Sequence, residues 1–479
     1  MDLLFNYTIS VLYKSSLFRQ LFLKYKPEKT LSNKYIRNYN NQNRRIAGKF
    51  ILKMSIIAFI NEYVTSPALV LFMVLSGSYF TFKQKLYSPK KLFFIFGELK
   101  HGGREDGISP LSSLSVALAG TLGVGNITGV AVAISVGGAG AVFWMILSSL
   151  LGAALKYREA YLTVKTRNKE TREGGAPYYI EKTGGRRAGC VYAVLCIIMS
   201  VISGSFVQMN AAASSLSLTY GVPTLLSGAV FAVLCVIIVI GGSRRVSAFT
   251  SSAMPLFCAV FAALSVVAIS MKINEVPAVI ARIFGEAFGF SQAAGGFSGA
   301  VIAAGIREGM TKGVFSHEAG CGTSSFSHAA SSLESPSAQG VIGVLEVLTD
   351  TLFFGGLTAL VILLSPAGKA YGGYDGAARS ISAYSYFFGG AAEHILTVLT
   401  VFFAFATVLC WAYYGCCCIR FIFKNEKYVK LYLVLYCLST AAGSIVSASV
   451  IWQISDILCA LLLAVNCVCL FKGRQYLYG

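Results

Sequence analysis

Long apolar runs constrain this chain more than any other feature of its sequence. Eleven runs have the length of about 20 residues that a helix needs to cross a bilayer. They cover residues 58–81, 112–136, 140–164, 189–219, 222–242, 250–271, 286–306, 340–364, 390–420, 428–448 and 450–471. Backbone polar groups in lipid must be satisfied within the protein, so each run is expected to be a helix. We therefore predict an all-α polytopic membrane protein with about 11 transmembrane helices.

Composition and charge agree with a membrane location. The 479 residues are 55% hydrophobic and only 13% charged, whereas about a quarter of the residues in a soluble domain are charged. The formal charge of +19 comes from Lys and Arg that concentrate in the loops after the odd-numbered spans, which predicts that these loops are cytoplasmic. The 13 cysteines lie mostly in apolar runs and are interpreted as buried hydrophobic side chains. We expect a multi-pass protein of the cell membrane, the inner membrane if the source is a bacterium.

The first 53 residues contradict this orientation. They are rich in Lys and Arg, yet they would lie on the outer side of the membrane. One interpretation is that translation begins at Met54 and that residues 1–53 lie upstream of the true start. The other is a basic extension that binds lipid head groups. On the first interpretation, a chain that begins at Met54 inserts and transports as well as the full chain.

Four glycines interrupt the second span, at positions 120, 123, 125 and 129. Each costs about 1 kcal/mol relative to alanine in a helix interior. The segment could be a small-residue face for close helix packing. It could instead be a broken helix, whose freed amides bind an anionic group while its freed carbonyls bind a cation. Asn126 suits such a break because its side-chain amide both donates and accepts hydrogen bonds.

A second interrupted helix is expected in an inverted second half. If residues 54–111 form an extra helix and a cytoplasmic loop, the other ten spans divide into 112–271 and 286–471, followed by a tail over 472–479. The counterpart of the second span is then 286–306, where residues 293–299 read AAGGFSG. Two helices interrupted at equivalent positions indicate a midplane binding site in a secondary transporter, which favours the broken-helix interpretation.

Four long motifs resemble the alanine or glycine:cation symporter family. They are GTLGVGNITGVAVAISVGGAGAVFWM (120–145), EGGAPYYI (173–180), KGVFSHEAGCGTSSFSHAA (312–330) and FAFATVLCWAYYG (403–415). The resemblance extends from about Met54 to the C-terminus. It implies a leucine-transporter-type five-plus-five inverted repeat with two broken helices. It also implies import of a small neutral amino acid, alanine or glycine, coupled to sodium by alternating access. Two positions depart from the family pattern: Val124 replaces a common threonine, and Cys416 replaces an acidic residue.

The resemblance implies a substrate site and a sodium site. The substrate site comprises Gly123, Val124, Gly125, Asn126, Gln208, Asn210, Phe297 and Trp411. The amides of Val124 and Gly125 would bind the substrate carboxylate. Gln208 could instead bond a neighbouring helix, and Trp411 could be an interfacial anchor. Sodium would bind the carbonyls of Ala119 and Leu122 and the hydroxyl of Thr407. No cofactor other than the coupling ion is expected.

Charged residues within the spans leave alternatives open. Glu346 and Asp350 lie one helical turn apart and are the best candidates for a proton site if the coupling ion is not sodium. Lys156 and Arg158 could snorkel to the cytoplasmic surface or pair with Glu159. His317-Glu318 lacks the His-Glu-x-x-His spacing of a zinc hydrolase, so an enzyme is not expected. An uncoupled channel or a substrate-sensing receptor on the same scaffold remains a further alternative.

Overall fold

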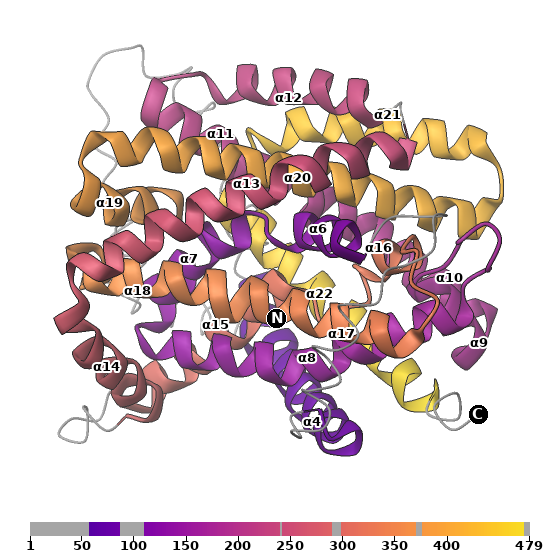
Figure 1. The fold of residues 1–479 in the computed structure, drawn as a ribbon, viewed down its shortest axis with the longest axis horizontal. Helices are drawn as coiled ribbons and strands as arrows, with labels where there is room; N and C mark the ends of the chain where they lie inside the picture. The colour runs from indigo at the N-terminus through magenta and orange to yellow at the C-terminus, as the bar shows by residue number, and fades with distance from the viewer. Residues whose placement is uncertain (1–56, 87–109, 240–241, 290–297, 370–375, 474–479) are drawn as a thin grey trace, which may run out of the picture. The chain divides into compact units, whose positions relative to one another are not determined.

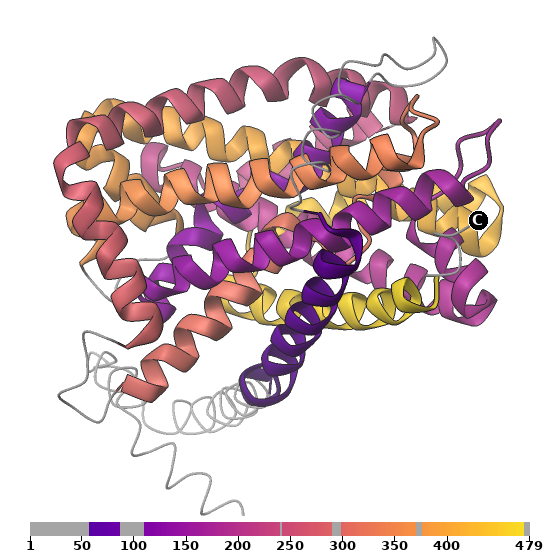
Figure 2. The ribbon, with the colours of Figure 1, turned by 60° about the horizontal axis from the view of Figure 1, so that its bottom comes forward.

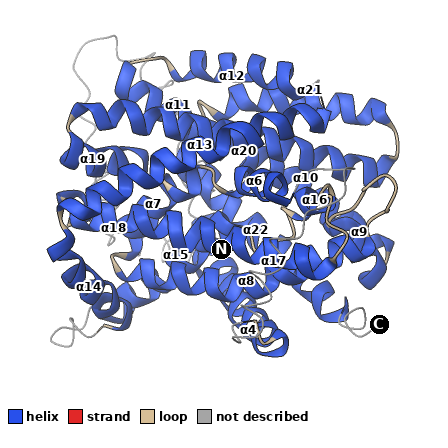
Figure 3. Cartoon of the chain, viewed as in Figure 1, coloured by secondary structure: helices blue, strands red, loops and turns tan. Residues whose placement is uncertain are grey.

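Every regular element of the computed structural model is a helix within the residues that it describes, which are 57–86, 110–239, 242–289, 298–369 and 376–473 (Figures 1 and 3). The proposed extension over residues 1–53 and Met54 lie outside these ranges. The prediction of an all-α protein is confirmed.

The described helices follow in chain order. In the first part they are α4 (Ser66–Gln84), α6 (Pro110–Thr121), α7 (Thr128–Gly137), α8 (Gly140–Thr166), α9 (Ala176–Gly184), α10 (Arg186–Val201), α11 (Gln208–Tyr220), α12 (Thr224–Val239) and α13 (Gly242–Met271). In the second part they are α14 (Val276–Phe288), α15 (Ser298–His317), α16 (Ser325–Ala329), α17 (Pro336–Val347), α18 (Gly356–Leu364), α19 (Gly376–Phe388), α20 (Gly390–Phe423), α21 (Glu426–Gly443) and α22 (Ala448–Lys472). Wider π-helical turns occupy Asn61–Thr65, Ile202–Val207 and Leu348–Gly355, and 3₁₀ turns occupy Val124–Asn126, Ile273–Glu275 and Pro366–Gly368.

Seven helical stretches in the described residues are long and apolar enough to cross a membrane, and the number is eight if the bent pair formed by α6 and α7 is one span. They are Ile57–Gln84, Gly140–Thr166, Arg186–Tyr220, Ala248–Met271, Pro336–Leu364, Gly390–Phe423 and Ala448–Lys472. Three other predicted spans coincide wholly or partly with helices that are less typical. Of these, α12 is only 16 residues long, and α15 and α21 each carry charged residues.

The first predicted break is confirmed. The segments Leu114–Thr121 and Val124–Gly137 are bent by 59° relative to each other. A single 3₁₀ turn, Val124–Asn126, joins the two helices, and the Ile127 amide donates to the Val124 carbonyl at 3.2 Å. Because glycine weakens a helix interior, the local sequence favours an interruption here.

The second break was predicted at the glycines of residues 293–299, but residues 293–297 lie outside those that the structure describes. Helix α15 runs without interruption from Ser298 to His317, past Gly299 and Gly305. The chain breaks after His317, over residues 318–324, and resumes as α16. Gly320 and Gly322 have φ of 86° and 77°, a left-handed conformation that glycine adopts without steric cost. This break after the end of α15 was not predicted from the sequence.

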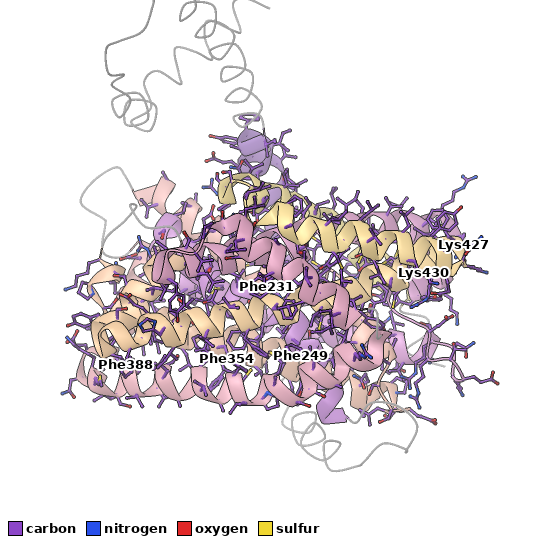
Figure 4. All side chains as sticks on the ribbon, turned by 90° about the horizontal axis from the view of Figure 1, so that it is seen from above. Phe231, Phe249, Phe354, Phe388, Lys427 and Lys430 are labelled. Atoms are coloured by element: carbon purple, nitrogen blue, oxygen red, sulfur yellow. The ribbon has the colours of Figure 1, made fainter. Side chains whose placement is uncertain are left out.

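Helix α8 packs against α15 and α17, α20 packs against α10 and α11, and α12 pairs with α21 (Figure 1). Helix α4 crosses α8 and α22 (Figure 2). Phenylalanines are distributed along the helices, whereas Lys427 and Lys430 extend from one end of α21 (Figure 4). Charged side chains at helix ends and apolar side chains between them are the pattern of membrane-spanning helices.

Candidate functional site

The break between α6 and α7 is bonded to Gln208. The Val124 amide donates to Gln208 Oε1 at 3.0 Å, and Gln208 Nε2 donates to the Ser203 carbonyl at 3.2 Å. Gln208 is 3% exposed and begins α11 directly after the wide turn Ile202–Val207. A side-chain oxygen thus accepts a hydrogen bond from one of the amides that the broken helix leaves without a backbone partner.

The same break is bonded to α20 on another side. Thr407 Oγ1 donates to the Ala119 carbonyl at 2.9 Å, and both residues are buried. Gly123 lies between the two contacts. A Cβ at this position would lie 2.6 Å from Gln208 Oε1 and 2.7 Å from Thr407 Oγ1. The absence of a side chain at position 123 therefore lets the Gln208 and Thr407 oxygens converge on the break.

Asn126 joins the break to a buried carboxylate. Its Nδ2 donates to Asp350 Oδ1 at 2.6 Å, and the hydroxyls of Ser316 and Thr351 donate to Oδ2 at 2.8 and 2.7 Å. Asp350 lies in the wide turn Leu348–Gly355 and forms no ion pair within the part of the chain that the structure describes. Asn126 Oδ1 is buried and has no hydrogen-bond partner among the same residues. Among the described residues, the arrangement places one unpaired oxygen acceptor, Asn126 Oδ1, and a hydrogen-bonded carboxylate beside the broken backbone.

Trp411 lies in the interior and is only 1% exposed. It packs against Gly204, where a Cβ would lie 2.3 Å from the indole Cγ, and its ring is 5.6 Å from that of Tyr414. An interfacial anchor would have its polar end in the head-group region. Trp411 of α20 is instead an interior side chain that packs against the wide turn Ile202–Val207.

The structure brings most of the predicted site together around the first break. Leu122 and Gly125 are buried there, and a Cβ on Gly125 would lie 3.3 Å from Ser316. Asn210 is placed elsewhere: it donates to the Val446 carbonyl at 2.7 Å and lines a separate cavity. Phe297 lies outside the described residues.

The two carboxylates of the eighth predicted span have different surroundings. Glu346 accepts from Lys156 Nζ at 3.2 Å and contacts His328 Nε2 at 2.9 Å, so it is already part of a buried ion pair. Lys156 pairs with Glu346 across two helices and does not snorkel to the surface, as its 0% exposure shows. Glu159 accepts from the Gly322 amide at 2.9 Å and from Asn466 Nδ2 at 2.7 Å.

Sequence reasoning missed Ser316 and Thr351, which complete the contacts of Asp350. Both are polar residues within or beside interrupted helices, but no spacing rule singles them out. His317 has a capping role at the end of α15, because the Ala319 amide donates to its Nδ1 at 3.0 Å. That contact makes Nε2 the protonated nitrogen of a neutral ring, which faces Ser148 Oγ at 3.2 Å.

Residues 50–473 match the sodium:alanine symporter family. The chain belongs to this family. It is 31% identical to the sodium/alanine symporter AgcS of Methanococcus maripaludis, over 85% of this chain and 91% of that protein. It is also 31% identical to the probable sodium/glutamine symporter GlnT of Bacillus subtilis, over 87% of each chain.

Solved structures confirm the fold. The crystal structure of MhsT in complex with L-phenylalanine aligns with a TM-score of 0.57 and 14% identity, over 79% of this chain and 91% of that one. The leucine-transporter-type fold that the resemblance implied is confirmed. This member of the sodium:alanine symporter family is a multi-pass membrane transporter and not an enzyme.

Proposed function

We propose that this symporter-family member imports alanine or glycine together with sodium by alternating access. The observation that carries the proposal is the convergence of Gln208 and Thr407 on Gly123, which places an amide donor and a carbonyl acceptor of the broken helix side by side. An anionic group needs the donor and a cation needs the acceptor.

The substrate carboxylate would displace Gln208 Oε1 from the Val124 amide, and the side-chain amide of Gln208 would then form a hydrogen bond with the substrate itself. That oxygen lies 3.0 Å from the amide nitrogen, which is the distance at which a carboxylate oxygen would bind. A hydrogen bond to a carboxylate is stronger than one to a neutral amide, which favours the exchange. Trp411 fills the space beside Gly204, so a small side chain is preferred. AgcS carries alanine in its name, which supports this choice, whereas GlnT carries glutamine.

Sodium would bind the oxygens that Thr407 and Ala119 now share in a hydrogen bond of 2.9 Å. A hard cation prefers oxygen ligands, and a hydroxyl and a main-chain carbonyl supply two. The Leu122 carbonyl is the third proposed ligand. When sodium is bound, the Thr407 proton turns away and both oxygens face the ion.

Proton coupling is the second candidate, and Asp350 is the observation that favours it. Its carboxylate is fully buried, accepts three hydrogen bonds and has no cation beside it within the described residues. A buried carboxyl in this setting can exchange a proton during a transport cycle.

Uptake into proteoliposomes tests both candidates. Labelled alanine and glycine are supplied with a sodium gradient, a proton gradient or neither, and unlabelled glutamine is added as competitor. Sodium-driven uptake that glutamine does not inhibit is expected. Uptake that ignores both gradients would point to an uncoupled channel and contradict the proposal.

Thr407→Val tests the ion site separately. Valine keeps the branched shape but lacks the hydroxyl, so the sodium concentration for half-maximal uptake should rise. Linkage requires that the loss of alanine affinity shrinks at saturating sodium. Thr400→Val is the matched control, because among the described residues this buried hydroxyl on the same helix bonds only to the Leu396 carbonyl, at 2.8 Å. A loss of alanine affinity that is the same at every sodium concentration would indicate that Thr407 contacts the substrate and not the ion.

A further inference from the structure

A cavity of about 360 Å³ lies beside the α7 side of the first break. Thr128, the first residue of α7, and Asn210 of α11 are among the residues that line it. The loop charges predict that this side of the break faces the outside of the cell. The cavity therefore adjoins the route by which a substrate would reach the central site.

A buried ion pair forms part of the cavity wall. Lys312 Nζ of α15 lies 2.8 and 3.0 Å from the two carboxylate oxygens of Asp456 of α22, and the side chains are 3% and 8% exposed. Asn61 Nδ2 also donates to Asp456 at 3.4 Å, and the Lys312 ammonium lies 4.7 Å above the Trp452 ring. This pair links α15 to α22 beside the cavity.

The charges of the cavity complement a dipolar ligand. An ammonium and a carboxylate lie side by side, so an ion of one sign would be attracted by one group and repelled by the other. The third charged group, Glu308, is already paired with Arg307 Nε at 3.2 Å. The indole of Trp452 supplies an apolar wall for a short side chain. The volume is near the lower end of the range for small-molecule sites.

We propose that this cavity is a second, outer binding site for the zwitterion of a small α-amino acid, whose carboxylate contacts Lys312 and whose ammonium contacts Asp456. The proposal rests on the proposed function, because it takes the transported substrate to be such an amino acid.

The zwitterion enters between the paired groups without leaving either one alone. If Lys312 and Asp456 were separated in this desolvated site with nothing between them, each charge would be buried without a partner, which is costly in free energy. A ligand that carries both charges gives each residue a new partner, and one ion pair becomes two. A ligand with one charge pairs with one of the two residues and leaves the other buried without a partner. Binding therefore separates α15 from α22 and selects zwitterions.

The first test is the number of alanine molecules bound per chain at equilibrium, measured with labelled L-alanine on the purified full chain. Two are expected for the parent. One is expected for Gln208→Ala, which weakens the central site, and one for the neutral pair Lys312→Met with Asp456→Asn. A single molecule in the parent, lost with Gln208→Ala, overturns the outer site and leaves the proposed function intact. No alanine bound to any variant overturns both.

The second test keeps both charges in place, so it does not depend on the folding of a charge variant. Ser449 is exposed and lines the cavity, and Ser447 is exposed nearby but does not line it. Cysteines placed at either position are labelled with a water-soluble methanethiosulfonate reagent. Alanine should slow labelling at Ser449→Cys, in the parent and in Gln208→Ala alike, and should leave Ser447→Cys unchanged. Propionate and alanine amide, which each lack one of the two charges, should not protect. Protection that disappears with Gln208→Ala, or that propionate reproduces, would refute a zwitterion site in this cavity.

Discussion

Replacing Gly123 with alanine should disable the central site, although it adds only one methyl group. The new Cβ would lie 2.6 Å from Gln208 Oε1 and 2.7 Å from Thr407 Oγ1, whereas ordinary contacts begin at 3.4 Å. Each oxygen must therefore retreat by about 0.7 to 0.8 Å. The hydrogen bond from the Val124 amide, now 3.0 Å long, would then exceed the 3.2 Å limit of a good N–H···O contact.

The cost follows from the groups that lose their partners. A buried donor or acceptor left unsatisfied costs about 1 to 3 kcal/mol, which for one such group weakens binding by roughly fivefold to 150-fold. The methyl also occupies the space between the proposed carboxylate and sodium positions. We expect a folded protein with a higher alanine concentration and a higher sodium concentration for half-maximal uptake.

Gly129→Ala is the matched control on the neighbouring helix turn. Its Cβ would lie 3.6 Å from Trp452, an ordinary contact, and alanine favours helix formation by about 1 kcal/mol. Uptake in proteoliposomes and melting temperature are measured for both variants. If Gly123→Ala transports with the alanine and sodium dependence of Gly129→Ala, the convergence of Gln208 and Thr407 on this glycine has no role in binding.

Three further substitutions test the surroundings of the site. Gly204→Ala places a Cβ 2.3 Å from the rigid Trp411 indole and should lower the free energy of unfolding by about 1 to 3 kcal/mol. The control is Gly356→Ala, whose Cβ would have no described atom within 4 Å and should leave stability unchanged. Equal melting temperatures for the two variants would contradict this packing. Arg167→Lys removes a planar group that donates to the carbonyls of Ala329, Ser331 and Leu333 at 2.6 to 2.7 Å, so amide hydrogen exchange after α16 should accelerate; unchanged exchange would show that these contacts do not hold the segment. Asp350→Asn replaces an oxygen that accepts from Ser316 and Thr351 with a donor, so ion-driven uptake should fall strongly while the melting temperature changes little. Uptake equal to that of the parent with both ion gradients would show that Asp350 is not part of the coupling site.

Apolar run lengths and glycine clustering were sufficient to predict the helical fold and the first break. Both are local properties: the length of a run decides whether it can cross lipid, and glycines weaken the backbone where they stand. The residues around Gly123 could be named because the family motif is continuous there. Asn210 lies only two positions after Gln208, but neighbouring residues on a helix point in different directions, and Asn210 faces the outer cavity.

The break after α15 was not predicted, because Arg307, Glu308 and Lys312 keep α15 from appearing as one apolar run, and the apolar window over 286–306 ended before His317. The signal of this break was the pair of glycines at 320 and 322. The partners of Lys156 and Lys312 could not be predicted, since Glu346 and Asp456 are 190 and 144 positions away and only tertiary packing brings them together.

The Lys156–Glu346 pair also affects how the chain enters the membrane. Lys156, Arg158 and Glu159 lie on one stretch of α8 and are all fully buried in the finished protein. A lysine or arginine at the centre of an isolated helix costs about 2.5 to 3.5 kcal/mol on insertion. At about 5 to 20 residues per second, a ribosome needs about 10 to 40 s to make the 190 residues between Lys156 and Glu346. During that time α8 has no carboxylate partner from α17, so any move of α8 into lipid before the second half has been synthesised carries this cost, and contact with the translocon or with earlier helices lowers it.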